Sequence, residues 1–197
     1  MVLRMVERPD DARITALALA AGRGDRTALA EFVRATQRDV HRFVTYLSGP
    51  GDADDLAQET YLQALRSLPR FANRSTARIW LLSIARHTAA DAVRIAVRRP
   101  RTSGVDDWEA LAAATGSREL VRSAGDEAVL LRSLVDRLDL DRRQAFVLTQ
   151  LLDLSYADAA EICGCPVGTI RSRVARARED LVEAVADTRG SRRAGQG

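Results

Sequence analysis

Apolar residues recur at steps of three and four along most of the chain, which is the spacing of one face of an α-helix. No stretch shows the strict alternation of apolar and polar residues that is typical of a half-buried β-strand. The pattern predicts helices at about residues 11–21, 27–47, 52–68, 76–97, 126–138, 141–152, 155–162 and 166–186. We therefore expect an all-α protein.

Composition divides these helices into two groups. Residues 102–125 are acidic and rich in Gly, Ser and Ala, a composition typical of a tether between domains. We expect two helical domains joined by a flexible linker, with a disordered tail at the end of the chain. The expected boundaries are residues 10–98 for the first domain, 99–125 for the linker, 126–186 for the second domain and 187–197 for the tail.

Residues 155–180 read as a helix-turn-helix. A short helix is expected to end at the turn Cys163-Gly164-Cys165. Pro166 is expected at the first position of the next helix, where its missing N–H has no intrahelical partner to lose. An apolar stripe on that second helix predicts which side faces a core. Its members are Val167, Ile170, Val174, Ala177 and Leu181.

The other side of this second helix carries hydroxyl and guanidinium groups. Such groups suit the DNA major groove, where guanidinium reads guanine edges and hydroxyls contact bases or phosphates. The alternative is an ordinary amphipathic helix with a solvated basic face. The candidate DNA-contacting residues are Thr169, Arg171, Ser172, Arg173 and Arg176.

The charge distribution supports contact with a polyanion at two places. All 30 basic residues are arginine, and the net charge is only +3. Residues 70–101, however, hold eight arginines and a single acid, Asp91, and the chain from Pro166 onward is again basic. Acidic chain separates the two basic blocks, so we expect two separate contacts with nucleic acid.

The predicted helix at residues 52–68 has an inward stripe, which includes Ala64, Leu65 and Leu68, and an outer face that no core explains. Asp52 is expected as its N-cap, and Asp55 and Glu59 are expected on the outer side together with Leu62. A single exposed leucine usually has no special role. Among acidic residues, its alternative role is the centre of a protein-binding face with a charged rim.

Several other classes of function find no support in the sequence. Cys163 and Cys165 supply only half the ligands of a structural zinc site, and His41 and His87 have no ligand pattern around them, so we expect no metal and no cofactor. No phosphate-binding glycine loop or nucleophile–base set is visible, so we do not expect an enzyme. The apolar run at residues 14–21 is too short for a membrane span, and we expect a cytoplasmic protein.

Two stretches resemble the extracytoplasmic-function sigma factors of bacteria. GDADDLAQETYLQALRSLPRF followed by RSTARIWLLSIARHTAAD is similar to their region 2, and LDRRQAFVLTQLLDLSYADAAEICGCPVGTIRSRVARARE is similar to their region 4. The resemblance covers roughly residues 10–186 and is closest to the actinobacterial sigma factor C type. It implies an alternative sigma factor that binds core RNA polymerase, recognises the −10 and −35 promoter elements and promotes DNA melting. The alternative is a helix-turn-helix regulator that acts without polymerase.

The resemblance also implies roles for individual residues. Contact with the clamp helices of the largest polymerase subunit is implied for Asp54, Asp55, Gln58, Glu59 and Leu62. Contact with the −10 element, including a flipped base, is implied for Phe71, Asn73, Arg74, Ser75, Arg78, Trp80, Ser83, His87 and Arg94. The loop at residues 71–76 is sparse in polar base-reading groups, and Trp80 has core packing as its alternative role. The helix-turn-helix is implied to read the −35 element. The polymerase flap and an anti-sigma factor are further implied partners.

Overall fold

The computed structural model describes residues 10–98 and 129–194. Within these two ranges every regular element is a helix and no residue is in a strand, which confirms the predicted all-α class. The predicted flexible linker at residues 99–125 lies outside the described residues. In the described part of the chain, no helix combines the length and apolarity needed to span a bilayer.

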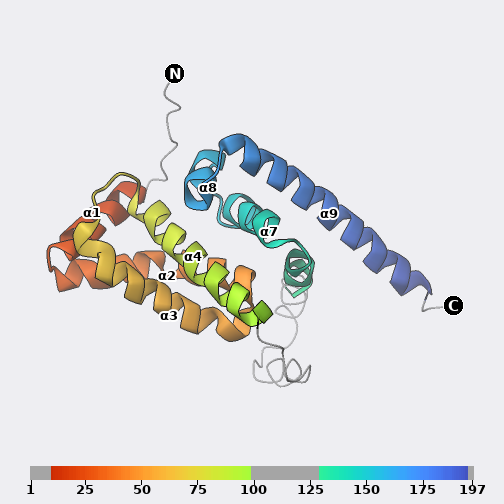
Figure 1. Cartoon of the computed structure of the whole chain (residues 1–197), viewed down its shortest axis with the longest axis horizontal. Helices are drawn as coiled ribbons and strands as arrows, with labels where there is room; N and C mark the ends of the chain where they lie inside the picture. Colours follow the sequence, from red (N-terminus) through yellow and green to blue (C-terminus); the bar gives the residue numbers. More distant parts are fainter. Residues whose placement is uncertain (1–9, 99–128, 195–197) are drawn as a thin grey trace.

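Residues 10–98 form a bundle that we call the N-terminal bundle (Figure 1). The long helices α2 and α4 lie at its centre, with α1 and α3 packed against them. Large apolar side chains such as Phe32 and Phe43 fill the interior. Its elements are α1 (Asp11–Gly22), α2 (Arg26–Ser48), α3 (Pro50–Ser67), the short 3₁₀ helix η1 (Leu68–Arg70) and α4 (Ala77–Arg98).

Local signals explain where these helices begin. The Asp25 side chain accepts a hydrogen bond of 3.0 Å from the backbone N–H of Ala28 and so caps α2. Thr76, directly before α4, accepts a hydrogen bond of 3.4 Å from the N–H of Ile79. The predicted start of α3 was two residues late. Proline is favoured in a first turn, so α3 begins at Pro50 and Asp52 lies inside its first turn.

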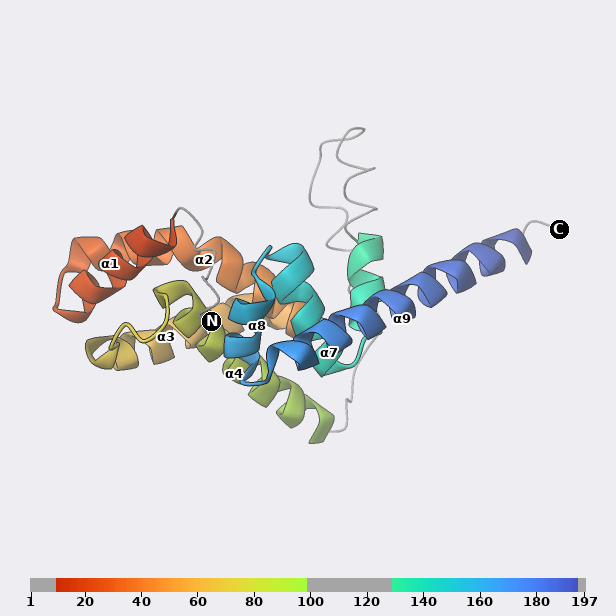
Figure 2. The same cartoon turned by 90° about the horizontal axis from the view of Figure 1, so that it is seen from above.

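Residues 129–194 form the second group, which we call the C-terminal unit. A helix over residues 129–136 is followed by α7 (Leu140–Phe146), the π-helical turn η2 (Val147–Leu151), α8 (Tyr156–Cys163) and α9 (Val167–Ala194). Figure 2 shows α9 extending well beyond the rest of the molecule. The helix continues to Ala194, so the disorder predicted from residue 187 is not seen over residues 187–194.

The helix-turn-helix forms where the sequence placed it. Ser155 and Asp158 make a reciprocal capping box at the start of α8. Gly164 ends α8 with a left-handed backbone (φ 63°), a conformation that glycine adopts without strain. The Pro166 carbonyl accepts bonds from the N–H groups of Thr169 and Ile170. Pro166 is therefore the N-cap of α9 and not its first helical residue, so the helix begins one residue later than predicted.

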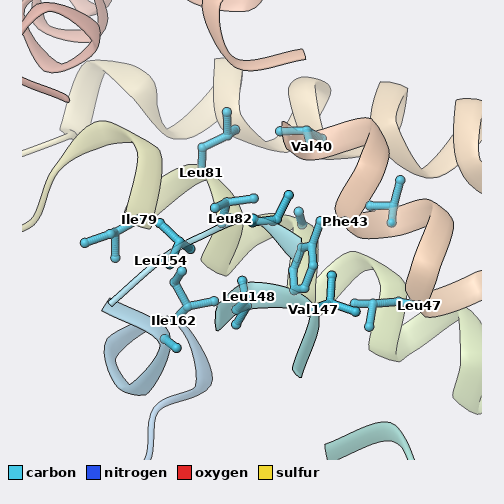
Figure 3. Close-up of a cluster of buried hydrophobic side chains, with 14 of the residues drawn as sticks. Val40, Phe43, Leu47, Ile79, Leu81, Leu82, Val147, Leu148, Leu154 and Ile162 are labelled. Atoms are coloured by element: carbon cyan, nitrogen blue, oxygen red, sulfur yellow. The ribbon is translucent and has the colours of Figure 1, made fainter. Parts of the chain in front are cut away.

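The bundle and the C-terminal unit pack directly against each other, which the sequence did not predict. Helix α4 lies along α8, and α2 contacts α7 and η2. Figure 3 shows one shared cluster in which bundle side chains meet side chains of the C-terminal unit. The bundle contributes Val40, Phe43, Leu47, Ile79, Leu81 and Leu82, and the C-terminal unit contributes Val147, Leu148, Leu154 and Ile162.

Two arginines of the C-terminal unit add polar contacts to this packing. Arg132 donates a hydrogen bond of 2.5 Å to the carbonyl of Thr45, and Arg143 donates one of 3.3 Å to the carbonyl of Leu47. Both carbonyls belong to the last turn of α2, where the helix dipole attracts cations, and the Thr45 carbonyl also accepts a bond of 3.1 Å from the N–H of Gly49. Burial lowers the pKa of the Arg143 guanidinium.

Candidate polymerase-docking and nucleic-acid interfaces

The acidic face of α3 lies on the surface as predicted. The side chains of Asp54, Asp55 and Gln58 are exposed, and Glu59 is half-buried beside them. Leu62 is 40% exposed within the same face. We call these five residues, together with Leu65, the docking face.

Leu65 is a member of this face that the sequence assigned to the core. It is also 40% exposed, and it lies three residues from Leu62 on the same side of the helix. The buried positions of α3 are small residues, Ala53, Thr60 and Ala64, and Leu65 falls beside this narrow stripe. The small size of these buried residues indicates that α3 contacts the bundle along a narrow strip. This sequence signal could have placed Leu65 outside the core. Two adjacent leucines therefore make an apolar centre with an acidic rim.

Hydrogen bonds hold two acidic side chains at the edge of the docking face. The Asp54 carboxylate lies 3.1 Å from His41 Nε2, and Glu59 accepts a bond of 3.0 Å from the amide of Gln63. Both contacts leave carboxylate oxygens free for a partner, since a carboxylate has four acceptor sites.

The candidate −10 loop is held by two aromatic rings. The centroids of Phe71 and Trp80 lie 4.9 Å apart with a tilt of 41° between the rings. Both rings are half-buried against the core, so Trp80 combines packing with partial exposure. Asn73 in the same loop has a left-handed backbone (φ 51°), and both Asn73 and Arg74 are exposed. Ser75 is half-buried.

Arg78 lies in the interior rather than on this surface. Its side chain is 9% exposed and makes ion pairs with Asp11 of α1 and Asp39 of α2. The resemblance had implied a contact of Arg78 with the −10 element. The three charges together join α1, α2 and α4. The guanidinium is committed to these carboxylates, so we leave Arg78 out of the proposed DNA surface.

Three further −10 candidates lie along the accessible side of α4. The hydroxyl of Ser83 donates a bond of 2.9 Å to the carbonyl of Ile79, and Arg94 forms a 2.5 Å pair with Asp91. His87 is exposed, and its Nδ1 lies 2.7 Å from the carbonyl of Ser83. These groups are close to the surface, although each has a partner on its own helix.

Arg86 is a residue of this region that the sequence did not single out. Its Nε donates a 2.9 Å bond to the carbonyl of Ile162 in α8, and its terminal nitrogen lies 3.1 Å from His87 Nε2. It therefore connects a −10 candidate to the helix-turn-helix. No local pattern marks this role, because Ile162 is 76 residues away in the sequence.

The candidate −35 residues lie in the first three turns of α9, and they differ in availability. Arg171, Ser172 and Arg176 are exposed, and Thr169 is half-buried. For the described residues, no ion pair is found for Arg171 or Arg176. Arg173 has two partners: its guanidinium pairs with the carboxylate of Asp141 and donates a 3.7 Å bond to the sulfur of Cys165.

The two thiols of the turn are free and half-buried. Burial raises the pKa of Cys163 to about 11, so this thiol is protonated at neutral pH. Within the described residues, no group of three or more His, Cys, Asp or Glu side chains is placed to hold a metal ion.

Comparison with known families matches both halves of the chain. The family described as Sigma-70 region 2 matches residues 32–99, and the family described as Sigma-70, region 4 matches residues 128–181. The first match covers most of the N-terminal bundle, including the docking face and α4. The second covers the helix-turn-helix and the candidate −35 residues.

Curated relatives extend this similarity over most of the chain. The ECF RNA polymerase sigma factor SigC of Mycobacterium tuberculosis (strain CDC 1551 / Oshkosh) is 53% identical over 173 residues, which cover 88% of this chain and 91% of the relative. EcfG of Rhodopseudomonas palustris (strain TIE-1) is 37% identical, with 78% of this chain and 83% of the relative covered. The sigma-E factor of Escherichia coli (strain K12) is 35% identical, with 81% and 87% covered.

Solved structures share the arrangement of helices. The sigma factor RpoE of Bartonella quintana, solved in complex with the anti-sigma factor NepR, is 28% identical with a TM-score of 0.61. The match covers 80% of this chain and 96% of that one. CnrH, solved in complex with the cytosolic domain of CnrY, has a TM-score of 0.67 at 24% identity, covers 88% and 97% of the two chains, and supports the fold alone.

Proposed function

The chain belongs to the extracytoplasmic-function sigma factors of the sigma-70 family, and we propose how its surfaces divide the work of that function. It is an alternative sigma factor of bacterial RNA polymerase, a protein that brings the core enzyme to promoters and promotes their melting. The relatives favour this function over a regulator that acts without polymerase. They are transcription regulators rather than known enzymes, and we propose no catalytic site.

The docking face is our proposed contact with the clamp helices of the core polymerase. The observation that supports it is the pair of exposed leucines, Leu62 and Leu65, within an acidic rim on a helix whose opposite side fills the core. Protein interfaces commonly combine an apolar centre with a polar rim. The carboxylates would meet basic side chains of the partner, and complementary charge of this kind fixes orientation and speeds association.

The loop after η1 and the accessible side of α4 are our proposed −10 surface. Phe71 and Trp80 supply aromatic rings near exposed Asn73 and Arg74. Aromatic rings stack on unpaired bases of any sequence, and arginines hold the backbone of the strand. A base that leaves the duplex loses stacking, and such a surface offsets part of that loss. Further proposed contacts are Ser75, Ser83, His87 and Arg94.

The start of α9 is our proposed −35 surface. Arg171 and Arg176 are exposed arginines, and Thr169 and Ser172 of the same segment carry hydroxyl groups. A recognition helix of this composition reads base edges in the major groove of intact duplex. The two proposed contacts correspond to the two basic blocks of the sequence. Helix α9 belongs to the block from Pro166 onward and would read duplex DNA, and α4 belongs to the block at residues 70–101 and would bind the single strand.

The remaining proposals concern organisation and partners. We propose residues 10–98 and 126–186 as the functional units, joined by the segment 99–125.

The solved Bartonella quintana sigma factor is bound to an anti-sigma factor, which supports the proposal that a protein of that kind binds this chain as well. The polymerase flap is a second proposed contact, and the cytoplasm is the proposed location because polymerase and promoters are there.

Reconstituted transcription tests the proposed function. Purified protein and core polymerase are supplied with genomic fragments, and run-off transcripts identify a promoter. Its −10 or −35 element is then scrambled. We expect transcripts only when protein and core are both present, and loss of transcripts from either scrambled promoter. Specific binding of the same fragments by the protein without core polymerase, and no transcripts with it, would favour a regulator that acts alone.

A further inference from the structure

Arg173 differs from the other arginines at the start of α9 in its surroundings. It is three residues from Ile170 and four from Ala177, both fully buried, so it lies at the border between the core side and the exposed side of the helix. Its side chain is 24% exposed. Arg171 and Arg176, in contrast, are exposed on the open side.

Both terminal nitrogens of Arg173 have partners inside the C-terminal unit. Nη2 pairs with the carboxylate of Asp141, the second residue of α7, and Nη1 donates a 3.7 Å bond to Cys165 Sγ in the turn before α9. The three residues thus connect the start of α7, the turn and the recognition helix. Asp141 is 32 residues from Arg173 in the sequence, so the contact joins two elements.

We propose that Arg173 is a positioning residue for promoter recognition, which braces α9 against α7 and the turn so that its neighbours meet the −35 bases at a fixed angle. The inference rests on the proposed −35 function of α9 and assigns Arg173 a role other than reading DNA. Asp141 then belongs to the recognition apparatus although it touches no DNA. A carboxylate near DNA would otherwise only repel phosphates.

The brace should affect orientation much more than folding. The Asp141 side chain is 58% exposed, and exposed ion pairs add little to stability. Its loss leaves the capping box, the Gly164 turn and the buried stripe of α9 in place. We therefore expect folded variants with unchanged melting temperatures and a two- to fivefold loss of preference for the −35 element, a range that follows from the small size of an exposed pair.

The substitution Asp141→Ala distinguishes bracing from direct DNA contact, because the two roles predict opposite changes in the affinity for the −35 element. If Arg173 reads DNA, removal of Asp141 frees its guanidinium and removes a negative charge, so binding becomes tighter. If Arg173 braces the helix, removal of Asp141 weakens −35 binding as Arg173→Ala does, and the double variant is no worse than either single one. Arg173→Lys keeps a cation for Asp141 and should retain most of the wild-type preference.

The test uses holoenzyme made from the full chain and core polymerase. Binding is measured on the run-off promoter fragment with an intact or scrambled −35 element at several salt concentrations. Glu161→Ala is the matched control, because it removes an exposed carboxylate of α8 that does not contact Arg173. We expect weaker −35 preference for Asp141→Ala and Arg173→Ala, an unchanged salt slope for Arg173→Ala, and no loss for Glu161→Ala.

Three results would overturn the inference, and they are distinguishable from failure of the proposed function. Tighter binding by Asp141→Ala, or a salt slope reduced by about 0.9 in Arg173→Ala, would show a direct phosphate contact. An Asp141→Ala preference equal to that of wild type would show that no brace acts. Equal binding of intact and scrambled fragments by wild-type holoenzyme would instead overturn the −35 function of α9 itself.

Discussion

Arg86 donates a hydrogen bond of 2.9 Å from its Nε to the backbone carbonyl of Ile162. The contact joins α4, which carries −10 candidates, to α8, the first helix of the helix-turn-helix. Ile162 is fully buried in the cluster that the two parts of the molecule share (Figure 3). The two proposed promoter-reading parts therefore hold each other in place in this conformation.

Arg86→Ala should loosen this contact and increase the reactivity of Cys163. Burial holds the Cys163 thiol protonated with a pKa of about 11, and the thiolate is the reactive form. The experiment uses a Cys165→Ser background and a neutral alkylating reagent at pH 8. We expect faster alkylation in Arg86→Ala. Loss of the nearby positive charge alone would raise the thiol pKa further and slow the reaction, so acceleration reports opening.

Arg94→Ala is the control for this experiment. It removes an exposed arginine of the same helix whose partner, Asp91, lies on α4 itself. Its alkylation rate should equal that of the parent. A rate in Arg86→Ala at or below the parent rate would mean that this hydrogen bond does not hold the two parts together.

The buried thiol also predicts a loss of stability at alkaline pH. Its folded-state pKa of about 11 exceeds the ordinary value of 9.0, so the folded state releases this proton later than the unfolded state does. The contribution of the protonated Cys163 thiol to the free energy of unfolding is complete below pH 9. It is lost as the pH rises from 9 to 11. Tyr61, whose pKa burial raises from 10.0 to about 12, adds a loss of its own between about pH 10 and 12, and this loss is common to wild type and Cys163→Ala. Melting curves should show a smaller alkaline loss in Cys163→Ala, and an equal loss would refute this assignment.

The sequence predicted the helices and the helix-turn-helix because both depend on local signals. Helical periodicity shows that one side of a helix is buried, but it does not show what covers that side. For this reason the packing of α4 against α8 was missed, and Leu65 was assigned to the core. The resemblance implied a −10 contact for Arg78, and its interior role was missed because its carboxylate partners are 67 and 39 residues away in the sequence.

Arg78→Ala should destabilise the fold rather than weaken DNA binding specifically. The substitution leaves the carboxylates of Asp11 and Asp39 without their shared cation, and removal of one member of a buried ion pair typically destabilises by about 3–5 kcal/mol. Urea unfolding measures this change. The control Arg74→Ala removes an exposed arginine of the −10 loop and should leave stability within about 0.5 kcal/mol. Equal stability of the two variants would contradict the interior role of Arg78.

Gly168→Ala should stabilise the protein and weaken −35 binding at the same time. A Cβ at this exposed position of α9 would meet no atom within 4 Å, and alanine favours a helix over glycine by up to about 1 kcal/mol. On the proposed DNA-facing side, however, the added methyl group would stand between the helix and the duplex. Gly51→Ala in α3 has equally open space and serves as the control for the stability gain.

Both variants are assayed by thermal melting and by −35 preference in holoenzyme. We expect both to melt higher and only Gly168→Ala to lose preference. Retained preference in Gly168→Ala would place the DNA farther from this turn of α9 than we propose.

Co-purification with core polymerase tests the central claim most directly, namely that the docking face of α3 makes this chain a sigma factor. The variants are the double charge reversal Asp55→Arg/Glu59→Arg, Leu62→Asp and Leu65→Asp. Each changes an accessible position of α3, so melting curves should stay close to wild type. The control is Ile95→Asp, which adds the same charge at an exposed apolar residue of α4.

We predict that the three docking-face variants fail to co-purify with core polymerase while Ile95→Asp is retained. Reversed charges would face like charges across the interface, and an aspartate at Leu62 or Leu65 would place an unpaired charge in its apolar centre. Wild-type retention of all three folded variants would contradict the claim and place the polymerase contact on another surface.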